Sequence, residues 1–463
     1  MKINWDKILF WLLISVVVTL PLQVTELLFP IHLLGSKFPV LEVSRILTAI
    51  GILALGVKLL ITKKIVFPRD PLTVILYVFV AISGLSLAVF RSNTGFLEVL
   101  RYFFHLGFFL LVINVVRDTS VFEKIIRAIL AGGFVISLFS IFQYFSGFYL
   151  WNGVLSEWDE SIGQIVNRVN ATFLNPNTLA SFLGIQILFS TAYYSLVTNR
   201  RRKVLAALVA SASIAALSYT FSRAGWASFG VSFISLILFL PKNLKMVSFY
   251  SLLVLVTAVV YVGSKGVQSR AKNIYDVVGV TTFDALEEKG TVSQETSFSN
   301  ISNDQKEKSK EVPIFLDQVL SLLPLNSNRL AATKAGVLMF LDNPIFGVGL
   351  SNFQETYLRE YSFLIKTDRP TTLSHNSFVT ILAEFGIIGL IWITTLLVIL
   401  ARYLLVIFRS DLGAKSLMLA VVSSLILLIL QSQYQGGLFE DPYFWLLSGL
   451  VVFGRRFSFQ GVV

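Results

Sequence analysis

The chain contains no cysteine, and charged residues make up only 14% of its 463 residues. The absence of cysteine excludes disulfides and thiol chemistry, although it does not fix the compartment. A soluble globular protein carries about 25% charged residues, whereas 55% of the residues here are hydrophobic. This shortage of charge excludes an ordinary soluble domain and indicates an integral membrane protein.

The apolar segments also lack the strict alternation of β-barrel strands. Continuous runs such as "ILFWLLISVVVTL" and "LMLAVVSSLILLIL" predict helices instead. The first run lacks a small-residue cleavage site, so we interpret it as a retained span rather than a signal peptide. At about 20 apolar residues for each crossing, we expect an all-α polytopic membrane protein with about twelve transmembrane helices, at residues 8–28, 41–61, 71–90, 96–116, 121–145, 177–197, 203–221, 224–240, 246–263, 376–408, 415–434 and 442–456. The tenth is long for one crossing, and we expect it to break near Gly386 and Gly389.

The net charge of +11 is distributed according to topology. Cations concentrate in alternate short loops, as in "NRRRK" at residues 199–203, and near both ends of the chain. The positive-inside rule then places both termini in the cytoplasm, and no nucleic-acid partner is expected. This arrangement divides the chain into spans one to nine (1–263), a large external loop between the ninth and tenth spans (264–375), and spans ten to twelve (376–463). Within the loop, residues 285–311 form a polar stretch of unassigned role, and an amphipathic helix is expected near 328–341.

One of only three histidines, His375, stands directly before the tenth predicted span, in "SHNSFVTIL". By topology, Arg168, Arg223 and Arg329 reach the same external side. Each has an ordinary structural interpretation, such as an arginine at the membrane interface or a solvated helix charge. Together, outward-facing arginines are typical of sites that bind pyrophosphate, and an imidazole held neutral beside them is able to accept a proton.

Other catalytic patterns are missing from the loops. No Asp/His/Glu cluster has metal-ligand spacing, so neither a metal nor a cofactor is expected. No G-x-S-x-G turn precedes the histidine, which disfavours a serine hydrolase. Glu98, Arg101 and His105 lie on one predicted span and Glu384 lies in another; an intramembrane functional site and a structural ion pair both stay open for them.

Four blocks of the sequence resemble a known family. "LDNPIFGVGLSNF" (341–353) and "SHNSFVTILAEFGIIGL" (374–390) are similar to the signature region of the O-antigen ligase and polymerase superfamily. "NATFLNPNTLASFL" (170–183) and "SYTFSRAGWASF" (218–229) are similar to its two upstream blocks. The polar stretch at 287–311 has no counterpart in that pattern.

The resemblance implies a fold, an activity and site residues. It implies an embedded bundle in the bacterial cytoplasmic (inner) membrane, with its active site facing the periplasm or exterior. The enzyme would transfer a glycan, without a metal, from a polyprenyl (undecaprenyl) pyrophosphate carrier to an acceptor hydroxyl. His375 corresponds to the histidine that activates the acceptor, and Arg223 and Arg329 correspond to arginines that hold the pyrophosphate. Arg168 is added to that pair with a weaker correspondence.

Several alternatives stay open from the sequence. A ligase would use a lipid A core as acceptor, which we favour, whereas an O-antigen or exopolysaccharide polymerase would use another glycan repeat and an oligosaccharyltransferase a protein hydroxyl. A twelve-span secondary transporter is the main rival from another class, although no six-plus-six repeat is evident. A carrier-binding or assembly factor without catalysis is a further alternative.

Overall fold

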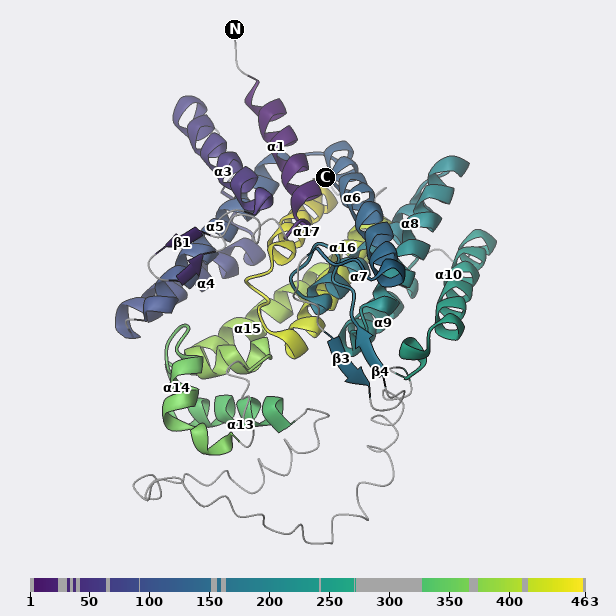
Figure 1. Ribbon diagram of the computed structural model, residues 1–463. Helices are drawn as coiled ribbons and strands as arrows, with labels where there is room; N and C mark the ends of the chain where they lie inside the picture. Colours follow the sequence, from purple (N-terminus) through teal and green to yellow (C-terminus); the bar gives the residue numbers. More distant parts are fainter. Residues whose placement is uncertain are drawn as a thin grey trace.

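The computed structural model describes residues 4–23, 31–33, 36–38, 42–63, 67–90, 92–150, 156–159, 164–240, 243–269, 271, 327–365, 374–409 and 415–460. The polar stretch 285–311 and much of the large loop around it lie outside these residues. The expected helical architecture is confirmed in the part of the chain that is described (Figure 1).

The helices are α1 (Trp5–Thr19), α3 (Val43–Thr62), α4 (Pro71–Phe90), α5 (Asn93–Val115), α6 (Thr119–Ser146), α7 (Pro176–Leu196), α8 (Arg200–Tyr219), α9 (Arg223–Ile237), α10 (Leu244–Gly263), α13 (Ser327–Asp342), α14 (Phe353–Glu360), α15 (Ser377–Arg409), α16 (Lys415–Gln435) and α17 (Pro442–Gln460). Short connections join the helices from α3 to α6 and from α7 to α10, whereas longer segments separate α1 from α3, α6 from α7 and α10 from α13. A short 3-10 turn, Ser362–Leu364, follows α14. Two antiparallel hairpins, which the sequence did not predict, pair β1 (Ile31–Leu33) with β2 (Ser36–Phe38) and β3 (Ser156–Asp159) with β4 (Gln164–Asn167).

Helix boundaries follow local chemistry. Asp118, Asn199 and Ser222 each precede a helix, and their side-chain oxygens accept hydrogen bonds from amides of its first turn, as N-cap residues do. The first predicted span, 8–28, extends beyond the described helix, because α1 ends at Thr19; residues 24–28 of that span lie outside the described residues. Leu20 still has helical backbone, but Pro21 follows it, and proline has no amide hydrogen with which to continue the helical hydrogen bonds.

Nine helices of the described part are long and apolar enough to cross a membrane. The other three predicted spans coincide with α1 and α9, which have 15 residues each, and with α17. The total of twelve crossings therefore stays a prediction.

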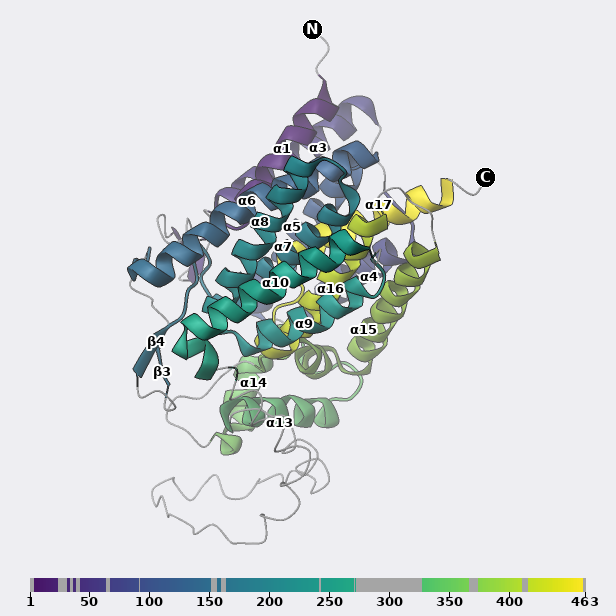
Figure 2. The same ribbon diagram turned by 90° about the vertical axis from the view of Figure 1, so that its right-hand side faces the viewer.

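The bundle is arranged around α7 and α16, which are the most buried of these nine helices, with 83% and 72% of the residues buried in an 18-residue apolar stretch of each. The two helices pack against each other, and α16 also contacts α9, α15 and α17. The start of α1 and the end of α17 lie away from α13 and α14, which cap the opposite end of the bundle (Figures 1 and 2). The last turns of α16 point toward that capped end.

The expected break in α15 is confirmed at Gly386, whose φ of 59° and ψ of −142° are not helical. The break frees backbone groups, and the turn after α13 pairs with them. Val348 N donates to the Ala383 carbonyl at 2.8 Å, and Gly349 N to the Glu384 carbonyl at 3.1 Å. In return, Ile387 N donates to the Pro344 carbonyl at 2.7 Å. The segment after α13 is thereby bonded to the first third of α15, at the point where the longer apolar part of that helix begins.

We expect Gly386→Ala to lower the melting temperature of the protein. A side chain at this φ is strained, which costs about 1–3 kcal/mol, and the added Cβ would lie 2.6 Å from the Pro344 carbonyl oxygen. Thermal unfolding in detergent measures the effect. Gly84→Ala is the control, because nothing lies within 4 Å of its Cβ position; an equal melting temperature in both variants would contradict the role of the break.

Candidate functional site

His375 is held in an unusual backbone conformation two residues before α15. Its φ is +50°, in the left-handed region that non-glycine residues seldom adopt. The residues on either side fix it there: Ser374 Oγ accepts from Asn376 N at 3.0 Å, and Asn376 Oδ1 accepts from the first amides of the helix. The hydrogen bonds that cap α15 thus fix the backbone position from which the His375 side chain extends.

The connection between α16 and α17 lies against the histidine. The imidazole is hydrogen-bonded to the backbone carbonyl of Gln435, the last residue of α16. Gly436, with φ of +78°, follows so closely that a Cβ there would lie 3.7 Å from His375 Cα. Two residues further on, Leu438 N donates to Ser377 Oγ at 3.2 Å. The starts of α15 and of this connection are therefore joined at two points.

The surroundings of His375 favour the neutral imidazole. Burial lowers its pKa from the ordinary value, and the positive charge of Arg329 lowers it further. The bond to the Gln435 carbonyl opposes these effects, because it stabilises the protonated ring. A ring nitrogen bonded to a carbonyl carries the hydrogen, so the other nitrogen of the neutral ring is an acceptor.

Arg329 lies in the first turn of α13, where the sequence predicted an amphipathic helix. Close packing of α13 on α15 brings the arginine near the histidine: a Cβ at Gly336 would lie 2.4 Å from Val379 Cγ1. One face of α13 is buried against the neighbouring helices. It consists of Ala332, Ala335, Leu338 and Met339, whereas Leu341 is 51% exposed.

Arg168 and Arg223 are connected through the start of α7. Arg168 donates from Nε to the Thr220 carbonyl at 2.9 Å and from Nη2 to Asn177 Oδ1 at 2.7 Å. The same amide oxygen accepts from Ser222 Oγ at 2.8 Å, and Ser222 caps α9. Arg223 follows that cap directly, and its side chain is exposed.

Glutamines near the end of α16 connect the group around His375 with the group around Arg168. Gln435 Nε2 donates to Thr178 Oγ1 at 3.1 Å, and Gln431 Nε2 to the Asn177 carbonyl at 3.4 Å. A chain of contacts thus runs from Arg168 through α7 and the glutamines to His375. Sequence reasoning missed the glutamines, although "QSQYQ" at 431–435 is a visible polar cluster at the end of an apolar run.

The second group of charges forms a structural link. Arg101 Nη1 lies 3.1 Å from Glu98 Oε1 and 3.2 Å from Glu440 Oε2. His105 Nδ1 is bonded to the Phe439 carbonyl at 3.2 Å, so this group joins α5 to the loop before α17. Glu384 is buried, and its Oε1 accepts from Phe353 N at the start of α14. The ion-pair interpretation is the one that these contacts favour.

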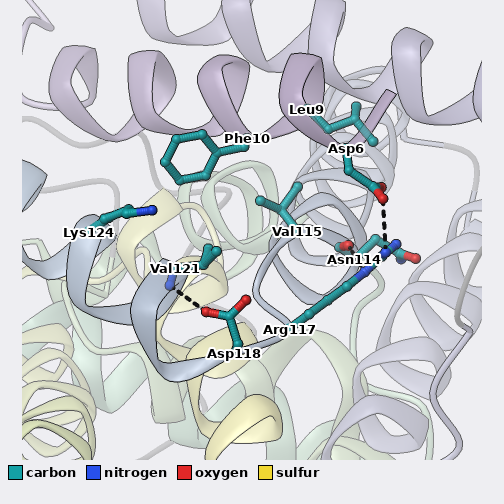
Figure 3. A pocket seen from close by; sticks show the side chains of 9 residues that line it. All are labelled: Asp6, Leu9, Phe10, Asn114, Val115, Arg117, Asp118, Val121 and Lys124. Atoms are coloured by element: carbon teal, nitrogen blue, oxygen red, sulfur yellow. Dashed lines mark hydrogen bonds and ion pairs between the residues drawn. The ribbon is translucent and has the colours of Figure 1, made fainter. Parts of the chain in front are cut away.

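A cavity of about 260 Å³ lies between α1 and the junction of α5 and α6, at the end of the bundle where α1 begins (Figure 3). None of the four predicted site residues lines it. Asp6 accepts from Lys58 at 2.7 Å and from Arg117 at 3.3 Å, and Asp118 caps α6. The acidic side chains that line the cavity therefore already form hydrogen bonds with other parts of the protein. We assign the cavity no part in the site.

The structure thus links Arg168 to His375 through Asn177 and the glutamines of α16, and it places Arg329 close enough to His375 to lower its pKa. Arg223 lies one residue beyond Ser222, a member of the same network. Within the described residues, no group of three His, Cys, Asp or Glu side chains is placed to hold a metal ion. The arrangement combines a neutral proton acceptor with cations on a surface next to the membrane spans.

Comparison with known proteins identifies the family of this region. The family model described as O-antigen ligase matches residues 206–394, a segment that contains Arg223, Arg329 and His375. Arg168 and the block at 170–183 lie outside the matched segment. No curated protein matches the chain. Residues 206–394 therefore match the O-antigen ligase family model, and this match confirms the predicted resemblance to the O-antigen ligase and polymerase superfamily.

Proposed function

We propose that the protein is a glycosyltransferase that moves a glycan from a polyprenyl (undecaprenyl) pyrophosphate carrier to an acceptor hydroxyl. The acceptor that we favour is a lipid A core, as in an O-antigen ligase. The reaction would take place on the outer side of the bacterial cytoplasmic membrane, at the end of the bundle that carries α13, with both termini in the cytoplasm. The domain boundaries predicted at 263 and 375 belong to the same proposal.

The observation that carries the proposal is the contact of His375 with the end of α16, with Arg329 close by and Arg168 linked through α7. A guanidinium keeps its charge at any working pH and binds phosphate oxygens in a bidentate manner. The leaving pyrophosphate gains negative charge as its bond breaks, and fixed cations stabilise that charge in the transition state. Arg223, exposed at the start of α9, is the residue best placed to meet a headgroup that arrives from the membrane.

The proposed step transfers one proton and one glycosyl group. The free nitrogen of His375 accepts the proton of the acceptor hydroxyl while that oxygen forms a bond to the anomeric carbon. The bond between that carbon and the pyrophosphate oxygen breaks, and the pyrophosphate leaves with the electron pair. Attack from the face opposite the leaving group inverts the anomeric centre. General-base catalysis of this kind contributes about 10²–10⁴-fold to a rate.

A reconstituted transfer assay tests the function. Purified protein would receive a polyprenyl-pyrophosphate oligosaccharide in EDTA, with a lipid A core, a second donor molecule or a serine-bearing protein as acceptor. Product on the lipid A core supports a ligase, and product on the second donor indicates a polymerase. Activity restored only by a divalent ion would contradict the metal-free mechanism. Failure on all three acceptors, with donor bound, would favour a carrier-binding role, and substrate-uptake assays would then test a transporter.

The pH dependence of transfer is a further expected result. A base must be neutral, so the rate should rise with pH through the pKa of His375, with a midpoint below the ordinary histidine value because burial and Arg329 lower that pKa. In Arg329→Ala one of the lowering effects is absent, so the midpoint should move to higher pH. Arg329→Lys keeps the charge and should leave the midpoint near that of the wild type. A midpoint that moves downward, or not at all, in Arg329→Ala would separate the arginine from the reacting base.

The glutamine contacts predict an effect at Thr178. Thr178→Val keeps the shape of the side chain but removes the acceptor of Gln435 Nε2. A net hydrogen bond is worth about 0.5–1.5 kcal/mol, so kcat should fall by about 2–10-fold while KM for the donor stays nearly constant. Thr395→Val is the matched control, because that hydroxyl bonds only within α15. Equal kcat in both variants would show that the contact does not position the histidine.

A further inference from the structure

The turn that leaves α13 presents three apolar side chains to the surroundings. Leu341, Ile345 and Phe346 are 51%, 58% and 60% exposed. They lie outside every helix long enough to span a membrane. The following helix exposes one apolar side chain, Leu358, at 44%, beside Arg359, which forms ion pairs with Glu355 and Glu360. Three exposed apolar side chains close together on one turn form a patch, and such a patch indicates a surface that binds something.

The backbone holds this patch rigidly. Gly347 N donates to the Asn343 carbonyl at 3.0 Å and closes the turn. The bonds between this segment and the break in α15 then fix the turn on the bundle, and the approach is so close that a Cβ at Gly347 would lie 2.4 Å from the backbone of Glu384. The apolar side chains therefore have a fixed position relative to the membrane helices.

The patch is continuous with the exposed apolar surfaces of two of these helices. Immediately after the break, α15 exposes Ile387 and Ile391, which are 39% and 61% exposed. On the other side, Gly349 packs against Phe90, the last residue of α4, and α4 exposes Val89 at 65%. Figure 1 shows α13 and α14 beside the first part of α15, on the side where α4 ends. The turn thus lies at the level where α4 ends and the long apolar part of α15 begins.

We propose that the turn Leu341–Phe346 is an interfacial anchor that inserts Leu341, Ile345 and Phe346 into the boundary between headgroups and acyl chains of the lipid bilayer. Apolar side chains next to the ends of spans bury into this boundary, where aromatic rings are favoured. A protein partner fits less well, because three side chains cover far less than the ~800 Å² that each partner buries in a stable interface. The anchor lies at one end of α13 and Arg329 at the other, about 20 Å away at 1.5 Å per residue. It would therefore set the height of that arginine above the membrane, whatever reaction the protein catalyses.

The absence of cysteine makes a direct test simple. Phe346→Cys and, separately, Ile345→Cys would be spin-labelled in the full-length protein and reconstituted into vesicles of phosphatidylethanolamine and phosphatidylglycerol. Power saturation with oxygen and with a water-soluble nickel complex then measures the depth of each label. Glu355→Cys on α14 is the matched control in water.

At positions 345 and 346, oxygen accessibility should exceed nickel accessibility several-fold, and position 355 should show the reverse. Nickel accessibility at 345 and 346 equal to that at 355 would overturn the anchor. Labels that neither reagent reaches would also overturn it, because they would be covered by protein, and dipolar broadening between labels would then identify a second copy. A melting temperature equal to that of the wild type confirms that each labelled variant is folded, and the agreement of two neighbouring positions guards against a local effect of one label.

Discussion

Replacement of His375 by alanine is expected to reduce glycan transfer by about 10²–10⁴-fold, the usual contribution of a general base. The imidazole is the titratable group whose surroundings keep it neutral, through burial and the charge of Arg329. Its hydrogen bond to the Gln435 carbonyl occupies one ring nitrogen as the donor, so the other nitrogen of the neutral ring is an acceptor. Donor binding should persist, because the arginines that are proposed to hold the pyrophosphate remain in place.

A second variant of His375 is needed to separate loss of the base from strain in the backbone of residue 375. A φ of +50° is unfavourable for alanine, whereas asparagine tolerates the left-handed region. His375→Asn should therefore keep the melting temperature of the wild type and still lose transfer, because an amide does not accept the proton. Single-turnover transfer and donor binding, measured on both variants, separate chemistry from folding. Normal transfer by the asparagine variant would remove the histidine from the mechanism.

Arg223→Ala and Arg329→Ala should each reduce transfer from the pyrophosphate-linked donor by about 10²–10³-fold, as the loss of one fixed donor to a developing anion does. Lysine at either position should restore the rate only in part, because an ammonium is a point charge and does not form the paired bonds of a guanidinium. The loss should be seen in kcat/KM for the donor, with the acceptor at saturation.

Arg359→Ala is the control for a general change in charge. Its side chain is exposed on α14 and pairs with Glu355 and Glu360 rather than with the site. It should transfer glycan at the wild-type rate. If both site variants kept the donor dependence of the wild type, the assignment of pyrophosphate to these arginines would be rejected.

Much of the helical architecture could be predicted because its cause is local. The span predicted at 71–90 coincides with α4, and that at 177–197 differs from α7 by one residue at each end, since apolar length and flanking caps act within one segment. The break at Gly386 was also predictable, because glycine adopts backbone angles that are unfavourable for other residues and it often interrupts a long apolar helix. The helix at the first span ends before Pro21 for an equally local reason, the missing amide hydrogen of proline, which the apolar pattern of the sequence does not report.

The sequence by itself determined which segments are helical, and a family resemblance selected His375 and three arginines. Only the tertiary structure decided that Arg168 is joined to the histidine by Asn177, Gln431 and Gln435, and that the turn after α13 bonds to the break near the start of α15. Gln431 and Asn177 are 254 positions apart in the chain. Hydrogen bonds at that separation leave no trace in hydrophobic periodicity, which records only whether each residue faces lipid, protein or water. The contacts that would position a base depend on how helices pack, and that is settled when the whole bundle assembles.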